Sequence, residues 1–209
     1  MKARILLFAA MAVALVSCGD SKRTDLFNGK DFEGWTKVID SKDTSGIDPF
    51  SVKDGVISIT GIPFGYIRTD KVYSDYKAHL EFRWVGGKGT NSGFFQRVQD
   101  EDDTWPRGVE CQMCHGSVGQ FIGLNGAAVE GVYPNEEGFS FKDACLGEEA
   151  ERPVGEWNEL DVICQGHQVR YFVNGVLRNT CEAELTSGHI GIQSEGGPLE
   201  VRNVYVEEL

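Results

Sequence analysis

The feature that most constrains the fold is an alternation of apolar and polar side chains over residues 76 to 84. Tyr, Ala, Leu, Phe and Trp occupy every second position there, and Lys, His, Glu and Arg fill the positions between them. Successive side chains of a β-strand point to opposite faces, so this pattern predicts a half-buried strand. The same period of two recurs at residues 109 to 114 and through most of residues 157 to 207, whereas only residues 143 to 151 look weakly helical.

Sequences typical of tight turns separate these predicted strands. Asn174-Gly175 is the strongest hairpin signal, and Asn28-Gly29, Asp54-Gly55 and Gly86-Gly87 mark further connections. The chain carries 26 glycines and shows neither an internal repeat nor a linker that would divide it. We therefore predict an all-β fold of two antiparallel sheets, with residues 26–209 forming a single sandwich domain.

The N-terminal residues have the features of an export signal. Lys2 and Arg4 precede an apolar run at residues 5 to 16, which is too short to cross a bilayer of about 30 Å as a helix. The following segment, Leu15-Val16-Ser17-Cys18-Gly19, resembles a bacterial lipobox, in which the cysteine receives a lipid after cleavage. We therefore expect a lipoprotein signal peptide at residues 1–17, lipidation of Cys18 and a polar tether at residues 18–25.

This interpretation places the mature chain in the cell envelope, attached to a membrane by its N-terminal lipid alone. Residues 19–22 lack the acidic cluster that we associate with surface export. The sequence thus favours the periplasmic side of the outer membrane and leaves the cell surface as the alternative.

The charge balance argues against one class of partner. The chain has 20 Lys and Arg against 32 Asp and Glu, a net charge of −12, and loss of Lys2 and Arg4 with the signal peptide makes it more negative. Proteins bind nucleic acids by neutralising phosphates with cationic side chains, so nucleic acid is not an expected partner. Neutral carbohydrate is compatible with such an acidic surface.

Cys111-Gln112-Met113-Cys114-His115 matches the pattern of c-type haem attachment. The alternation around it predicts a strand, in which Cys111 and Cys114 point to opposite sides, whereas haem attachment needs a helical turn. No second pair of ligands lies at zinc-binding spacing. We therefore expect neither haem nor zinc here and place Cys111 in the core. The five cysteines that follow Cys18 are an odd and sparse set, which does not indicate a disulfide framework.

The sequence also resembles a known family along nearly all of its mature length. The matching segments, in the order of the family, are Leu26 to Trp35, Asp54 to Ile57, Gly65 to Ile67, Leu80 to Trp84, Asn91 to Phe95, Val109 to Gln112, Gly155 to Asn158, Val173 to Val176, Gly191 to Pro198 and Arg202-Asn203. They resemble the domain of unknown function 1080, also called the 3-keto-disaccharide hydrolase domain, found in lipoproteins of Bacteroidetes type. The resemblance implies a jelly-roll sandwich of the concanavalin A-like lectin and glucanase architecture, with the site on a concave face. Cys114-His115 departs from the family pattern.

The predicted strands carry candidate sugar-binding residues on their polar faces. Glu110 and Gln112 lie opposite the apolar Val109 and Cys111, and Glu81 with Arg83 stands likewise opposite Leu80 and Phe82. If the two strands were neighbours, they would project a carboxylate, an amide and a guanidinium from one face, which suits a sugar. Aromatic side chains would cover its apolar faces at the rim, the candidates being Trp105, Phe121 and Tyr133. The alternative for Glu81 and Arg83 is a solvated cross-strand ion pair.

For a 3-keto-glycoside, the carbonyl at carbon 3 acidifies the hydrogen on carbon 2, and the resulting enolate expels the glycosidic oxygen before water adds. On this hypothesis Glu110 or His115 is the base, and Arg83 or Arg97 acts with Gln112 at the enolate oxygen. Glu195 is a second acid or a substrate contact, and Asn91 a substrate contact. A divalent metal held by Glu110 and His115 could replace the arginine.

Two other functions are compatible with the sequence. One is a conventional glycoside hydrolase with paired carboxylates, although the chain lacks the Glu-x-Asp-x-x-Glu strand of such sandwich hydrolases. The other is a glycan-binding lipoprotein without catalysis, which would tolerate the loss of Glu110.

Overall fold

The computed structural model describes residues 22–101 and 103–209. The expected signal peptide and residues 18–21 of the expected tether, Cys18 included, lie outside these residues, whereas residues 22–25 of the tether are described. None of the described residues is helical, so the weak helical signal at residues 143 to 151 was wrong and that segment is irregular. Among the same residues, no helix has the length and apolar character needed to cross a membrane.

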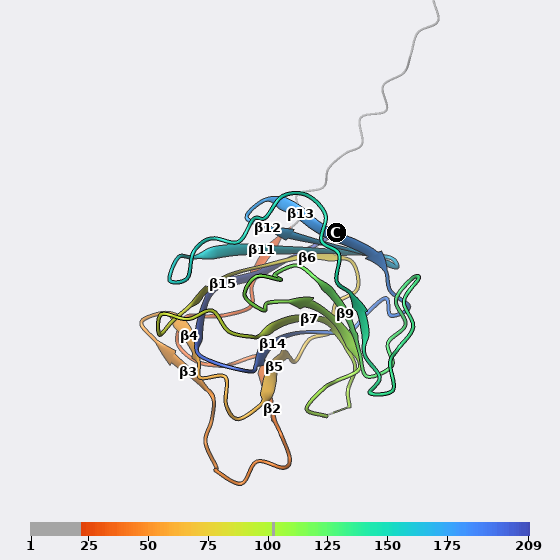
Figure 1. The fold of residues 1–209 in the computed structure, drawn as a ribbon. Coiled ribbons are helices and arrows are strands. Elements are labelled where there is room, and N and C mark those ends of the chain that lie inside the picture. Colours follow the sequence, from red (N-terminus) through yellow and green to blue (C-terminus); the bar gives the residue numbers. More distant parts are fainter. Residues whose placement is uncertain (1–21, 102) are drawn as a thin grey trace, which may run out of the picture.

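The described residues form β-strands that pack as two layers (Figure 1). Their bounds are β1 Arg23–Asp25, β2 Trp35–Ile39, β3 Phe50–Lys53, β4 Val56–Ile59, β5 Gly65–Thr69, β6 Tyr76–Trp84, β7 Gly93–Val98, β8 Gly108–Gln112, β9 Phe121–Leu124, β10 Ser140–Lys142, β11 Asn158–Gln165, β12 Gln168–Val173, β13 Val176–Glu182, β14 His189–Ser194 and β15 Leu199–Glu208. Sheet A has the order β13-β12-β11-β6-β15-β4-β3, with β1 also paired to β15, and sheet B has the order β10-β9-β8-β7-β14-β5-β2. All strand pairs are antiparallel, which confirms the predicted two-sheet sandwich.

The longest alternating segment of the sequence occupies the middle of sheet A. Strand β6 matches the predicted strand at residues 76 to 84, and it pairs with β11 on one side and β15 on the other. Its apolar side chains, among them Leu80 and Phe82, are buried between the sheets. The predicted hairpin is also present, because Asn174-Gly175 joins β12 to β13 with both residues at positive φ.

The main core lies between the two sheets and is rich in aromatic side chains. Phe121 of β9 stacks on Tyr171 of β12, with 4.9 Å between ring centroids, so the two sheets meet through this pair. Both rings are fully buried. The expectation that Phe121 lies at the rim of a sugar site was therefore wrong, because its side chain points to the inner face of sheet B.

Sheet B carries a second apolar cluster on its outer face. Its buried members come from β2, β5, β7 and β9 and are Val38, Tyr66, Phe95, Val98, Ile122 and Leu124. The partly buried Phe139 packs against them. An antiparallel sheet commonly exposes one face to water, and the outer face of sheet A follows this rule with charged side chains. The apolar outer face of sheet B therefore forms a sheltered floor beneath the loops.

A buried guanidinium ties loops together at one end of the sandwich. Arg97 has none of its surface exposed and has a positive φ of 57° at the end of β7. It donates hydrogen bonds to the carbonyl oxygens of Gly166 at 2.5 Å, His167 at 3.4 Å and Leu185. Arg97 thus binds the backbone inside the sandwich, and this position does not suit the enolate-stabilising role that the sequence suggested.

Loss of this guanidinium should destabilise the fold. We expect Arg97→Met to lower the free energy of unfolding by about 3 kcal/mol, because the buried guanidinium and its hydrogen bonds to three loop carbonyl oxygens are lost. The matched variant Arg83→Met removes a surface ion pair with Glu200 and a cation–π contact with Trp157, and it should cost about 1 kcal/mol. Urea unfolding of both variants measures the difference, and equal losses would contradict the structural role of Arg97.

Candidate functional site

The outer face of sheet B contains a pocket of ≈ 400 Å³. Strands β8 and β9 supply its floor, and the residues before β7, before β8, before β10 and after β14 supply its walls. The lining residues are Asn91, Trp105, Glu110, Gln112, Ile122, Leu124, Glu137, Phe139, Phe141 and Glu195. Five of the predicted site residues, Asn91, Trp105, Glu110, Gln112 and Glu195, are thus brought together.

The period of two in β8 explains how Glu110 reaches the pocket. Val109 and Cys111 point into the main core, so Glu110 and Gln112 must point to the outer face. Glu110 lies opposite Phe95 on the neighbouring strand β7. A Cβ atom on Gly93 of that strand would overlap the Glu110 carboxylate, so the missing side chain provides the space that the carboxylate occupies.

The pocket makes the two carboxyl groups chemically unequal. Glu110 is only 3% exposed, and burial together with the negative charge of Glu195 raises the pKa of Glu110 well above its ordinary value. Glu195 is less buried, and burial raises its pKa as well, but without so strong a shift. Asn91 Nδ2 donates a hydrogen bond of 2.7 Å to Glu195 Oε2, and a hydrogen bond with the Gln193 side chain offsets part of the rise in the pKa of Glu195.

Several buried polar atoms of this face have no hydrogen-bond partner among the described residues. They are Asn91 Oδ1, Glu110 Oε1, Gln112 Oε1 and Gln193 Oε1, while the amide group of Gln193 lies beside Glu195. Leaving a buried polar atom unpaired costs about 1 to 3 kcal/mol, so their concentration here indicates a place where a polar ligand binds. The sequence reasoning missed Gln193, although the alternation in residues 189 to 193 could have placed it on the face opposite Ile190 and Ile192.

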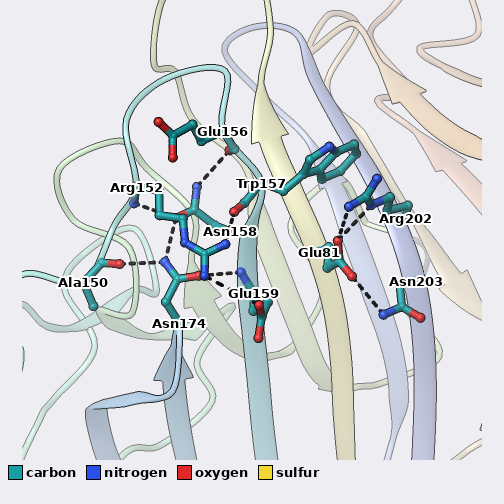
Figure 2. A network of polar contacts seen from close by, with 10 residues as sticks. All are labelled: Glu81, Ala150, Arg152, Glu156, Trp157, Asn158, Glu159, Asn174, Arg202 and Asn203. Atoms are coloured by element: carbon teal, nitrogen blue, oxygen red, sulfur yellow. Dashed lines mark hydrogen bonds and ion pairs between the residues drawn. The ribbon is translucent and has the colours of Figure 1, made fainter.

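Glu81 and Arg83 lie elsewhere. The expectation that their strand neighbours that of Glu110 was wrong, because β6 is in sheet A and β8 is in sheet B. Figure 2 shows Glu81 accepting hydrogen bonds from Arg202 at 2.8 Å and Asn203 at 3.0 Å, both on β15. Arg83 donates to Glu200 at 2.7 Å. The ion-pair interpretation is therefore the correct one, with partners on β15.

The same surface of sheet A has an aromatic centre. Trp157, which precedes β11, lies beneath the guanidinium of Arg202, 3.9 Å from its ring centroid (Figure 2). The Arg83 guanidinium lies 4.7 Å from the same centroid. Nearby, Asn174 donates from its amide to the Ala150 carbonyl oxygen and to Asn158 Oδ1, which fixes the loop before β11. These contacts join side chains of sheet A to each other and to the adjoining loop.

His115 does not line the pocket. Its Nδ1 lies 2.5 Å from Glu151 Oε1, and the Glu151 carboxylate also accepts hydrogen bonds from Trp84 Nε1 and the Gly116 amide. The two groups considered as metal ligands, Glu110 and His115, thus have separate environments. Among residues 22–101 and 103–209, no three His, Cys, Asp or Glu side chains gather at metal-binding spacing.

The two cysteines of the haem-like motif differ in burial, and the aromatic candidates differ in their distance from the pocket. Cys111 is buried in the core, as expected, while Cys114 is only partly buried beyond the end of β8. Tyr133 is 91% exposed and does not line the pocket, unlike Trp105.

The outer face of sheet B also has cationic and imidazole groups that the sequence reasoning missed. Arg68 of β5 pairs with Gly191 of β14, and its Nη1 lies 3.1 Å from His189 Nε2. His189 Nδ1 lies 2.6 Å from the Thr69 carbonyl oxygen, to which it must donate. No motif marks these residues, and their proximity depends on the pairing of two strands that are distant in the sequence.

A family model described as the 3-keto-alpha-glucoside-1,2-lyase-like domain matches residues 22–207, nearly all of the described chain. The chain belongs to this family. The resemblance drawn from the sequence is therefore confirmed, and the 3-keto-glucoside lyase-like domain has its candidate site on the outer face of sheet B. A search of curated protein sequences found no match.

Solved structures share the fold of this lyase-like domain. A candidate glycosyl hydrolase from Parabacteroides distasonis is 23% identical with a TM-score of 0.64, over 90% of this chain and 94% of that one. A carbohydrate-binding module from Bacillus subtilis is 14% identical with a TM-score of 0.61, over 84% and 96% of the two chains. A β-glucanase from Bacillus licheniformis is 16% identical with a TM-score of 0.57, over 92% and 99%. These likenesses confirm the concanavalin A-like jelly-roll architecture.

The burial of Glu110 predicts a dependence of stability on pH. Because the pKa of Glu110 is raised on folding, its neutral form adds stability that is complete below the unfolded-state pKa of about 4.3 and is lost as the pH rises through the folded-state pKa. Glu110→Gln should therefore become more stable than the wild type as the pH rises from 5 to 9, which urea unfolding at each pH would measure.

Glu81→Gln is the matched control with the opposite sign. Burial raises the pKa of Glu81, but hydrogen bonds from Arg202 and Asn203 lower it further, so the net pKa lies below its ordinary value. The Glu81→Gln variant should be less stable than the wild type at neutral pH, and this deficit should vanish in acid. If Glu110→Gln followed the same course, the burial of a neutral Glu110 would be contradicted.

Proposed function

We propose that this chain cleaves 3-keto-glycosides through removal of the proton on carbon 2, elimination of the leaving group and addition of water. The observation that carries the proposal is the pair Glu110 and Glu195, two carboxyl groups of unequal pKa in one sheltered pocket. Such inequality is how a site obtains an acid and a base from the same chemical group. The family match and the unpartnered polar atoms of the pocket support a carbohydrate substrate.

The reaction has two parts. A base takes the hydrogen from carbon 2, the electron pair of that bond forms an enolate with the carbon 3 carbonyl, and the enolate then expels the glycosidic oxygen from carbon 1. An acid protonates the departing oxygen. Water next adds to carbon 1 of the unsaturated ketone while carbon 2 regains a proton. The products are a free 3-keto-sugar and the released alcohol, and the sum is hydrolysis.

The pocket distinguishes the two roles. Glu195 has the smaller pKa shift and accepts a hydrogen bond from Asn91, so it is the carboxylate available as the base. Glu110 has the stronger upward shift in pKa and an unpartnered Oε1, so it keeps a proton for the leaving oxygen. On sequence grounds Glu110 or His115 was the base; the environments of the carboxylates favour Glu195 instead.

Amide groups rather than arginines suit the enolate oxygen. Gln193 is buried on the same face beside Glu195, and Gln112 lines the pocket. Ile122 and Leu124 make the floor apolar, and a hydrogen bond to a developing negative charge is stronger where water is excluded. Arg83 and Arg97 both have other partners outside the pocket.

Two rival functions remain distinguishable in the same assay. A conventional glycoside hydrolase would also use an acid and a base of unequal pKa, and it would cleave substrates without the keto group. A glycan-binding protein would bind sugar through the unpartnered amides and release nothing.

The test combines 3-keto-disaccharides, their unoxidised parents and single carboxylate variants. We expect release of sugar from the keto forms only, a drop of about 10²- to 10⁴-fold in kcat for Glu110→Gln and Glu195→Gln, and little change for Glu81→Gln. Deuterium at carbon 2 should slow the reaction if its removal limits the rate. Binding measured by calorimetry should survive both pocket substitutions.

Leaving-group dependence tests the two roles. A nitrophenolate leaves without an acid, so Glu110→Gln should retain far more activity on a nitrophenyl 3-keto-glucoside than on a disaccharide, while Glu195→Gln should lose both. Cleavage of unoxidised parents would establish conventional hydrolysis, and binding without any release would establish the glycan-binding function.

We further propose that Cys18 carries the membrane anchor, on the support of the lipobox-like sequence around it. Full-length protein expressed in a bacterial host should incorporate a labelled fatty acid and sediment with membranes. Cys18→Ser should abolish both, while Cys114→Ser should change neither. Retention of the label in the Cys18 variant would refute the assignment.

A further inference from the structure

The proposed function leaves a close pair of polar side chains beyond the end of β8 without a role. His115 Nδ1 lies 2.5 Å from Glu151 Oε1, and only 5% of the Glu151 side chain is exposed. Trp84 Nε1 and the Gly116 amide donate to the same carboxylate, at 3.0 and 2.8 Å. A buried carboxylate with three hydrogen-bond partners has little freedom to move. Glu151 is therefore a fixed point to which the His115 ring is hydrogen-bonded.

Backbone pairing places His115 next to a residue of the pocket. The Met113 amide donates to the Ser92 carbonyl oxygen at 2.9 Å, so the ladder between β7 and β8 continues beyond both strands. The His115 amide donates to the Thr90 carbonyl oxygen, also at 2.9 Å. His115 thus lies opposite Thr90, and the next residue, Asn91, lines the pocket. Because side chains alternate between the faces, His115 points to the inner side, as the buried Met113 does.

The imidazole of His115 lies directly against the backbone of Gly89. A Cβ atom on Gly89 would lie 2.1 Å from His115 Cγ and 2.4 Å from its Cβ and Cδ2. Gly89 does not have a positive φ, so this contact, rather than the backbone conformation, is what requires a glycine there. The ring therefore limits how far residues 89–91 can move toward it.

The same segment contacts the residues that follow β14. A Cβ atom on Gly197 would lie 2.6 Å from Thr90 Oγ1, so the two loops touch at this point. Asn91 Nδ2 lies 2.7 Å from Glu195 Oε2. Residues 89–91 are therefore in contact with the His115 ring on one side and with the loop of Glu195 on the other.

We propose that His115, anchored by Glu151, is a positioning residue for Glu195. It acts through residues 89–91, which bring the Asn91 amide to its place beside the Glu195 carboxylate. The inference rests on the proposed function, which assigns Glu195 as the base. In the described part of the chain, neither His115 nor Glu151 lines the pocket, so neither is a catalytic residue. A displacement of about 1 Å in a reacting group can slow a reaction by about 100-fold, which makes such indirect support important.

The first measurement needs no substrate and follows the side-chain amide of Asn91 by NMR, with its signals assigned by their loss in Asn91→Ser. We expect exchange of these amide protons with water to be about tenfold faster in His115→Ala, because the hydrogen bond to Glu195 is no longer held in place. Gly89→Ala should have the same effect, since its Cβ atom displaces the ring. His115→Asn should keep the slow exchange, because its amide can donate to Glu151 in place of Nδ1.

Kinetics with a 3-keto-disaccharide test the effect on the base. We expect His115→Ala to lower kcat about 10- to 100-fold and to change KM less than about threefold, because Glu195 is displaced while the pocket lining is kept. The double variant His115→Ala/Asn91→Ser should be no slower than Asn91→Ser alone, since both changes act through one hydrogen bond. The matched control is His167→Ala. His167 is exposed, does not line the pocket and has its Nδ1 2.9 Å from the Ala183 carbonyl oxygen, so its loss should change neither kcat nor the amide exchange.

Circular dichroism first confirms that each variant is folded. Additive losses of kcat in the double variant would overturn the positioning role, and so would wild-type amide exchange in both His115→Ala and Gly89→Ala. Failure of the proposed function gives a different result: the wild type would release no sugar, while the NMR measurement would still report on the contact between Asn91 and Glu195. Faster exchange in the two variants would then establish that His115 holds this contact, and unchanged exchange would refute it.

Discussion

The packing of sheet A against the inner face of sheet B determines the direction of every side chain on sheet B. Phe121 meets Tyr171 across this interface, and Val109 and Cys111 are buried beside them. Because successive side chains of a strand point to opposite faces, burial of the odd-numbered residues of β8 directs its even-numbered residues to the outer face. Glu110 and Gln112 consequently point outward as a result of core packing. Their positions in the pocket are therefore fixed by the packing of the core beneath them.

The outer face of sheet B combines an apolar floor with acidic groups, and the two features act on each other. Ile122 and Leu124 reduce the water around Glu110, which raises its pKa, and the nearby charge of Glu195 raises it further. A hydrogen bond with the Gln193 side chain instead offsets part of the rise in the pKa of Glu195. Burial and the neighbouring charge thereby give two residues of the same type different protonation behaviour.

The parts of the structure that follow local rules could be predicted from the sequence. The alternation gave strand β6, the turn residues gave the β12–β13 hairpin, and the face of Glu110 followed from its position between Val109 and Cys111. Neighbouring strands could not be predicted in this way, because pairing between strands far apart in the sequence depends on packing. Glu81 and Arg83 were placed beside Glu110 for that reason. Arg97 has the polar character of a ligand-binding residue, and only its backbone partners show that it is structural.

Gly93 has a wider consequence. The position of the Glu110 carboxylate depends on Gly93 having no side chain, so the candidate pocket can change without a change in any charged or polar residue. Even alanine there would place a Cβ atom against the Glu110 carboxylate, so the end of that side chain would have to move. A relative could therefore retain every carboxylate and amide of the candidate site and still hold them in different positions. A comparison of the polar side chains alone would miss that difference, because it depends on a glycine of the neighbouring strand.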